Sequence, residues 1–285
     1  MATEGAERRA SPRGGAIAAQ RLLHTRLDMV DLGQALSIVA ERPAVLPFAY
    51  VVTPNADHLL RLESPGGEAL RAVYENAWLS LLDSRVLRLL AARRGYRLTV
   101  VPGSDLAQAL FRTVIRPDTP VTLIGGGAAV AGRLRASFGL RALAHHEPPM
   151  GFIDDPAAVE ACVRFVLEHP ARFVLLCVGS PRQELLAARI AATGRATGLG
   201  LCLGAAVEFV AGVKRRAPRW VQRAHLEWLH RLASEPRRLW RRYLLEAPRL
   251  LSLMRRLPPA PVAAVPGSPL SCAAAWPGRQ ARKPR

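Results

Sequence analysis

One carboxylate in this sequence stands where a catalytic base would be useful. Asp83 ends an apolar run, residues 77–82, that resembles a buried strand, and residues 85–94 after it have helical spacing. Position alone favours a cap for that helix. The chemical alternative is a general base that takes a proton from a hydroxyl group. Both roles can coexist, because ligand clefts in parallel sheets open at the ends of the strands.

Polar side chains follow two other predicted strands. Thr53 and Asn55 come at the end of the apolar run 44–53, where they can cap the next helix or bind a ligand; taken alone, capping is favoured. Gln183 comes after residues 173–178 and a Gly-Ser-Pro turn. Its amide carries a donor and an acceptor together, which suits recognition of a sugar or a base.

A triple glycine follows the predicted strand 121–124. The backbone N–H groups of Gly125 and Gly126 can approach a phosphate or a sugar at the start of the next helix. The pattern is weak evidence for a dinucleotide, because Val130 stands where the third glycine of that fingerprint belongs. It is better evidence for a diphosphate of any kind.

The sequence contains no Walker lysine, DxD or HExxH motif, and we expect neither a metal nor a cofactor. Asp154 and Asp155 are interpreted as a solvated turn, and His145 and His146 as surface residues. The cysteines lack metal-ligand spacing, so we expect them to be reduced, buried thiols of a cytoplasmic protein. They are Cys162, Cys177, Cys202 and Cys272.

Apolar runs and helical patterns alternate along most of the chain. This alternation predicts an α/β fold with a mostly parallel, doubly wound, Rossmann-like sheet. The predicted strands are 44–53, 77–82, 121–124, 173–178 and 198–203. The predicted helices are 26–40, one containing Leu59, Leu60 and Leu62, 85–94, 128–138, 157–168 and 183–192.

Positive charge is concentrated at the C-terminal end. The formal net charge is +18, and residues 213–256 contain thirteen Lys and Arg against three acids. That surplus of ten, with four more bases in the tail, leaves about +4 for the first 212 residues. Tryptophans and a tyrosine lie among the arginines, which suits an anionic membrane surface. Nucleic-acid phosphates are an alternative partner, but no nucleic-acid-binding motif accompanies them.

These changes of composition predict four segments. Residues 1–21 are expected to be a flexible arm, residues 22–212 an α/β core, residues 213–256 a basic helical appendage and residues 257–285 a disordered tail. In the appendage, Pro236 is expected to open a helix that Pro248 interrupts. No apolar run is long enough to span a bilayer, and the N-terminus lacks the pattern of a secretory signal.

In their order and spacing, the motifs resemble the WecG/TagA/CpsF glycosyltransferases, glycosyltransferase family 26, over about residues 27–250. Those that carry the resemblance are Thr53-Pro54-Asn55, Asp83, Gly103-Ser104-Asp105-Leu106, Leu123-Ile124-Gly125-Gly126, Gly179-Ser180-Pro181-Arg182-Gln183-Glu184, Gly204-Ala205-Ala206-Val207-Glu208-Phe209, Arg216-Ala217-Pro218, Leu226-Glu227-Trp228-Leu229 and Glu235-Pro236-Arg237-Arg238-Leu239. Two positions depart from the family pattern: Ser84 replaces a usual glycine, and Glu208 replaces a usual aspartate.

The resemblance implies an inverting, metal-independent transfer of a sugar from a UDP-sugar to a polyprenyl-diphosphate-linked saccharide at the inner face of the plasma membrane. N-acetylmannosamine, its uronic acid and glucose are all compatible with it. The resemblance makes Asp83 the general base. It gives Thr53, Asn55 and Gln183 to the substrate cleft, and it places Arg231, Arg238 and Arg241 at the nucleotide diphosphate.

Two other classes of function remain open from the sequence alone. One is a nucleotide-cofactor oxidoreductase on a similar sheet, against which the incomplete glycine fingerprint counts. The other is a basic adaptor without catalytic activity that binds a membrane or nucleic acid. A homo-oligomer is compatible with the sequence, which does not determine the oligomeric state.

Overall fold

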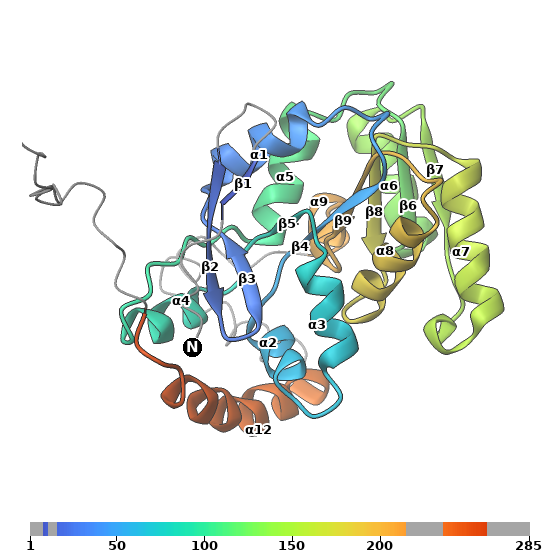
Figure 1. Cartoon of the computed structure of the whole chain (residues 1–285). Helices are drawn as coiled ribbons and strands as arrows, with labels where there is room; N and C mark the ends of the chain where they lie inside the picture. The colour runs from blue at the N-terminus through green and yellow to red at the C-terminus, as the bar shows by residue number, and fades with distance from the viewer. Residues whose placement is uncertain (1–7, 11–15, 215–235, 261–285) are drawn as a thin grey trace, which may run out of the picture.

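The computed structural model describes residues 8–10, 16–214 and 236–260. Six strands form a sheet in which every neighbouring pair runs parallel (Figure 1). In order across the sheet they are β5 (Leu79–Ser80), β4 (Ala49–Val52), β9 (Leu199–Cys202), β8 (Phe173–Cys177), β6 (Val121–Gly125) and β7 (Leu143–His146). The predicted Rossmann-like α/β fold is therefore confirmed.

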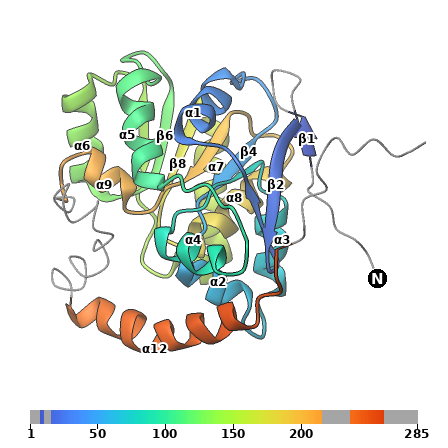
Figure 2. The same ribbon diagram turned by 90° about the vertical axis from the view of Figure 1, so that its left-hand side faces the viewer.

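Helices cover both faces of this sheet (Figure 2). Strand β8 shows why: Phe173 and Leu175 point into one apolar cluster, and Val174 and Leu176 point into the other. One face is covered by α1 (Leu32–Glu41), α5 (Gly103–Thr113), α6 (Gly127–Phe138) and α9 (Ala206–Val210). The other is covered by α3 (Glu68–Glu75), α7 (Pro156–Glu168) and α8 (Arg182–Ala192), with the 3-10 turn η1 (Phe152–Asp154) before α7.

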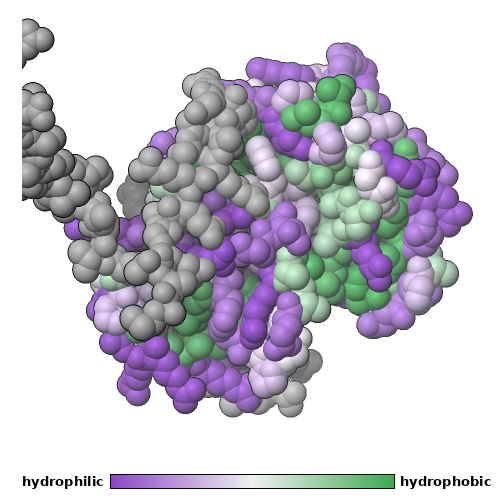
Figure 3. All heavy atoms as spheres, in the orientation of Figure 1, coloured by the Kyte–Doolittle hydropathy of each residue, from purple (hydrophilic) through white to green (hydrophobic). Residues whose placement is uncertain are grey.

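A third apolar cluster joins the C-terminal helix to the body of the protein. Here α12 (Pro236–Arg255) packs against α2 (Ala56–Leu62) and α4 (Arg85–Ala92) through Leu250 and Met254, joined by Leu257 just after the helix. These three residues recur at the spacing of one helical face. In Figure 3, hydrophilic side chains line the lower left edge of the molecule, where the C-terminal half of α12 lies in the view of Figure 1.

This packing corrects two predictions about the C-terminal segment. Pro248 lies inside α12 and does not interrupt it. The tail was predicted to be disordered from residue 257, but Leu257 is 2% exposed in the third cluster. Three residues later, Ala260 donates its backbone N–H to the backbone oxygen of Arg94 at 2.8 Å. Residues 250–260 are thus packed onto the core. The remainder of the predicted tail, 261–285, lies outside the described residues.

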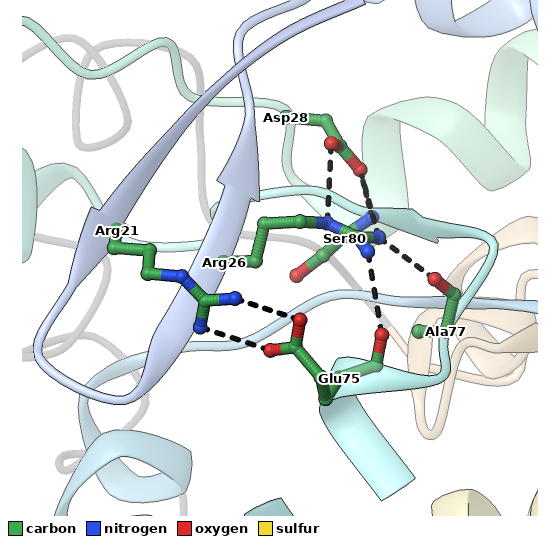
Figure 4. A network of polar contacts seen from close by, with 6 residues as sticks. All are labelled: Arg21, Arg26, Asp28, Glu75, Ala77 and Ser80. Atoms are coloured by element: carbon green, nitrogen blue, oxygen red, sulfur yellow. Dashed lines mark hydrogen bonds and ion pairs between the residues drawn. The ribbon is translucent and has the colours of Figure 1, made fainter. Parts of the chain in front are cut away.

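A small antiparallel sheet precedes the main one. It consists of β1 (Arg8–Ala10), β2 (Ala16–Leu22) and β3 (Thr25–Asp28). A buried ion pair fixes it to the edge strand β5 (Figure 4). Asp28 accepts a hydrogen bond from the backbone N–H of Ser80 at 2.7 Å, and Arg26 donates to the backbone oxygens of Ala77 and Glu75 at 2.7 and 3.3 Å.

The arm predicted for residues 1–21 is therefore wrong where the structure describes it, because residues 16–22 form β2. The first helix also begins later than the predicted residue 26. Asp31 and Gln34 form a reciprocal capping box at its N-terminus, with hydrogen bonds of 2.8 and 2.9 Å. The chain before that cap belongs to β3. Helices α3 and α5 and strand β7 were not predicted.

Candidate active site

The carboxyl edge of the sheet carries the polar residues singled out from the sequence. We use this name for the residues that directly follow β5, β4, β9, β8 and β6. Thr53 follows β4, is buried, and donates a hydrogen bond from Oγ1 to the backbone oxygen of Cys202, 3.3 Å away at the end of β9. Helices α3 and α9, which come after these two strands, lie on opposite faces, the arrangement in which α/β sheets bind ligands.

Asp83 is held at this edge by backbone contacts. Its N–H donates to the backbone oxygen of Pro54 at 2.8 Å, and its Oδ2 accepts from the N–H of Gly103 at 3.3 Å. The cap of α4 is a different residue, Ser84, whose Oγ accepts from Leu87 N at 3.2 Å. The prediction that Asp83 caps the helix after it is thus wrong; its half-buried carboxylate accepts instead from the first residue of α5 (Gly103–Thr113).

Gly103 brings Asp83 and Thr53 together. A Cβ atom at this position would lie 3.2 Å from Thr53 Oγ1 and 3.4 Å from its Cγ2, closer than side chains normally approach. The absence of a side chain lets the start of α5 pass beside Thr53 while its N–H binds Asp83. In the sequence this glycine is visible only as part of a motif, and its positioning role was not predicted.

Asn55 lies at the same edge but serves the helix that follows. Its Oδ1 accepts hydrogen bonds from the N–H groups of Asp57 and His58 at 3.0 and 3.4 Å, which caps α2. The capping role favoured from the sequence is confirmed. A ligand contact through its amide group is a separate prediction, which stays a prediction.

Gln183 and Glu184 form a buried pair in the first turn of α8. Gln183 Nε2 donates to Glu184 Oε1 at 2.8 Å, and the two residues are 3% and 0% exposed. Gln183 Oε1 points the other way, toward the carboxyl edge: a Cβ atom on Gly204, after β9, would lie 3.5 Å from it. Within the part of the chain that the structure describes, this oxygen has no hydrogen-bond partner.

Further buried polar side chains lie behind the pair. Burial raises the pKa of the Glu184 carboxyl above its usual value, against the opposing effect of nearby Gln183, Ser180 and Tyr74. Burial and the Glu184 charge raise the pKa of the Tyr74 hydroxyl well above its usual value. Tyr74 Oη is also 3.0 Å from His58 Nδ1. A polar chain therefore runs from His58 through Tyr74 to Glu184 and Gln183.

The glycine loop after β6 lies farther along the same edge. At Gly125, φ is +82°, and a Cβ atom there would come within 2.7 Å of Val178 Cγ1, so packing against the end of β8 already requires this glycine. Gly126 begins α6 in the left-handed conformation. The N–H of Gly127 donates to Glu147 Oε2 at 2.7 Å, so a carboxylate occupies the point where a bound phosphate would sit.

The structure describes the three arginines assigned to a diphosphate only in part. Arg231 lies outside the described residues. Arg238 and Arg241 belong to α12, but their side chains lie outside what the structure describes. Helix α12 itself packs against α2, which starts at the carboxyl end of β4. The helix is thus on the side of the sheet where Asp83 and Thr53 lie.

The possible metal ligands and the cysteines of the described ranges form neither a metal-binding cluster nor a disulfide. There, no group of three His, Cys, Asp or Glu side chains could hold a metal ion. The cysteines described are free, and burial raises the pKa of each, that of Cys162 to about 11. Cys162 and Cys202 are buried, as predicted from the sequence, whereas Cys177 is half-buried.

A comparison with protein families gives this geometry a context. The model of the glycosyl transferase WecG/TagA/CpsF family matches residues 20–259. The chain belongs to this family. It is therefore a glycosyltransferase of a family that acts in polysaccharide biosynthesis, and the resemblance inferred from the motifs is confirmed.

The WecG/TagA/CpsF match begins inside β2 and ends just after α12. It therefore includes the whole of the basic appendage, residues 213–256, which was predicted to lie outside the α/β core. Of the predicted site residues, the structure brings Asp83 and Thr53 together through Gly103 and places Gln183 beside Gly204 on the neighbouring strand. It adds Glu184 and Tyr74, which sequence reasoning did not assign to the site.

Proposed function

We propose that this glycosyltransferase moves a sugar, with inversion, from a UDP-sugar to a polyprenyl-diphosphate-linked saccharide during surface polysaccharide synthesis. The donor sugar is N-acetylmannosamine, its uronic acid or glucose. The observation that carries the proposal is the position of Asp83. It is a carboxylate at the carboxyl edge of a parallel sheet, the helix that follows it is capped by Ser84 instead, and its neighbours there are Thr53 and Gly103.

In the proposed reaction, the Asp83 carboxylate takes the proton from an acceptor hydroxyl group. The hydroxyl oxygen forms a new bond to the anomeric carbon of the donor sugar. The bond from that carbon to the diphosphate oxygen breaks, and UDP leaves with the electron pair on the opposite face. One general base on one side of the sugar is sufficient for this inversion.

The departing diphosphate requires positive charge. We propose that Arg231, Arg238 and Arg241 supply it without a metal ion, because guanidinium groups bind phosphate oxygens in pairs and stay charged. The support is the place of α12, which packs against α2 at the carboxyl edge. The Gly127 N–H already donates a hydrogen bond to Glu147, and we therefore place the diphosphate away from the glycine loop.

The proposal predicts sugar transfer by the full chain in a defined assay. Purified protein is mixed with a panel of UDP-sugars and a short-chain polyprenyl-diphosphate-linked acceptor, and UDP release and glycosylated product are measured together. We expect one donor to give equal amounts of both, with turnover unaffected by EDTA. A change of NAD(P)H fluorescence on mixing, or steeply salt-dependent DNA binding with no UDP-sugar turnover, would instead support one of the two alternative functions.

We also propose that the protein works on the inner face of the plasma membrane, bound to its anionic lipids. Helices α4 and α12 provide a surface of described residues for this contact. Arg94 donates to the backbone oxygen of Arg255, so the C-terminal ends of the two helices adjoin. Exposed on these helices and the turns after them are Val86, Arg88, Leu89, Arg93, Arg249, Leu251, Arg255 and Arg256. Within the described residues no helix is long and apolar enough to cross a bilayer.

This surface predicts charge-dependent vesicle binding. We expect the variant Arg88→Glu/Arg93→Glu to bind anionic vesicles at least tenfold more weakly, because each basic residue near such a surface contributes about 1 kcal/mol. Co-sedimentation with vesicles of anionic or neutral lipid measures it. Arg133→Glu/Arg164→Glu, at exposed positions on α6 and α7, is the matched control with the same change of net charge. Equal losses in the control and the α4 variant would show that net charge alone is responsible, and would contradict the surface.

A further inference from the structure

We propose that Glu184 fixes the direction of the Gln183 amide, so that Gln183 accepts a hydrogen bond from the ligand at the carboxyl edge and does not donate one to it. The inference rests on the proposed function, because it concerns the same site and a ligand of the UDP-sugar class. It makes Glu184 a positioning residue, which acts through Gln183, and it makes Gln183 Oε1 a determinant of specificity.

The geometry of the pair gives the amide one orientation. The end of the amide that faces Glu184 is Nε2, which lies 2.8 Å from Oε1 of Glu184. With Glu184 ionised, its carboxylate only accepts hydrogen bonds, so Nε2 is the end of the amide that it holds. The reversed amide would bring two oxygens together in a buried place. Gln183 Oε1 is therefore turned toward Gly204 at the end of β9.

The carboxylate is itself held in place. Tyr74 from α3 and Ser180 from the turn before α8 lie close enough to interact with it. Tyr74 is tied in turn to His58 from α2, with 3.0 Å between Oη and Nδ1. Two elements, α3 and the turn before α8, thus reach Glu184, and α2 supports the first of them through Tyr74.

The outward oxygen then lacks a partner in the described part of the chain. Buried polar atoms in folded proteins are nearly always hydrogen-bonded, and leaving one without a partner costs about 1–3 kcal/mol. Gln183 Oε1 lies beside Gly204 at the carboxyl edge, and its missing partner is explained if the ligand donates the hydrogen bond. Its partner is then an O–H or N–H group: a sugar hydroxyl, an acetamido N–H or the imide N–H of uracil.

Glu184→Gln is the first test, because it keeps the shape of the side chain. Two facing amides have no fixed direction, so Gln183 can present either end to the ligand. We expect the Kd for the UDP-sugar that the wild type binds best to rise about tenfold. Calorimetric titration measures it, and the melting temperature of each variant checks that the fold is kept.

A double-mutant cycle separates positioning from general damage. Gln183→Met removes the amide altogether. If Glu184 acts through Gln183, adding Glu184→Gln to Gln183→Met leaves the Kd within about twofold of the Gln183→Met value. Effects that instead multiply independently would mean that Glu184 only supports the fold, and would overturn the inference.

The exchanged pair is a rescue experiment. Gln183→Glu alone sets two buried carboxylates side by side and should impair binding most. Gln183→Glu/Glu184→Gln restores one acid and one amide in the opposite order and still presents an oxygen at position 183. We expect the exchange to recover affinity to within about threefold of wild type, and no recovery would count against the proposed direction.

Analogues identify the hydrogen that Gln183 receives. N3-methyl-UDP lacks the imide N–H, and singly deoxygenated UDP-sugars lack one hydroxyl each. The analogue that lacks the hydrogen received by Gln183 should bind wild type more weakly than the intact ligand does. The Glu184→Gln substitution should then weaken the binding of that analogue no further. If wild type binds no UDP-sugar, the proposed function falls and the inference with it. If wild type binds them and Glu184→Gln binds equally well, the inference alone is overturned.

Discussion

Asp83→Asn is expected to lower turnover by a factor of about 10² or more, because the neutral amide cannot take the proton from the acceptor hydroxyl. The fold should be unaffected. Asparagine can still accept from the N–H of Gly103, the N–H of residue 83 still reaches Pro54, and Ser84 still caps α4. Initial rates with a saturating donor give kcat, and a thermal melt with and without UDP tests whether fold and donor binding are retained.

Ser84→Ala is the matched control for this variant, one residue along the chain. It removes the hydroxyl group that caps α4 and is expected to lower stability by about 1 kcal/mol while turnover stays near wild type. The two substitutions should thus have opposite profiles, one chemical and one structural. Near-normal turnover in Asp83→Asn would remove Asp83 from the role of base, whatever the family membership.

The strands and their polar ends could be predicted because both signals are local. Runs such as residues 173–177 are apolar throughout, as strands buried on both faces must be, and a parallel sheet gathers the residues that follow them at one edge. Asp83, Thr53 and Gln183 were found in this way. Helices α3 and α5 were missed because the residues that begin them, Gly67 and Pro102, make no side-chain cap.

Buried charge explains most of what the sequence concealed. Glu184 has the composition of an exposed first helical turn, because charged residues are almost never fully buried unless paired. Only the packing of α8 against α3 and β9 shows that it is buried. Arg26 and Asp28 were likewise predicted only as part of a helix, residues 26–40. Their burial depends on contacts with Ala77 and Ser80, about fifty residues away in the sequence.

That ion pair supports the second large prediction, on stability. Arg26→Met is expected to lower the free energy of unfolding by about 3–5 kcal/mol, because it leaves the Asp28 carboxylate buried without its cation. Asp28 is 4% exposed, and its carboxylate is 3.4 Å from the Arg26 guanidinium. The substitution also deprives the backbone oxygens of Ala77 and Glu75 of their donor. Urea denaturation followed by circular dichroism measures the change.

Arg21→Met is the comparison, since Arg21 lies on the neighbouring strand and pairs with Glu75 at 2.7 Å. Its side chain and that of Glu75 are 29% and 43% exposed, so this pair should contribute at most about 1 kcal/mol. Asp28→Asn added to Arg26→Met should recover part of the loss, because no buried charge remains. Equal effects of the two arginine substitutions would contradict the burial argument. A larger effect of the Arg26 substitution than of the Arg21 substitution would show that the hairpin β2–β3 helps to support Asp83. Asp28 of this hairpin binds Ser80 in β5, and the chain runs from β5 directly to Asp83.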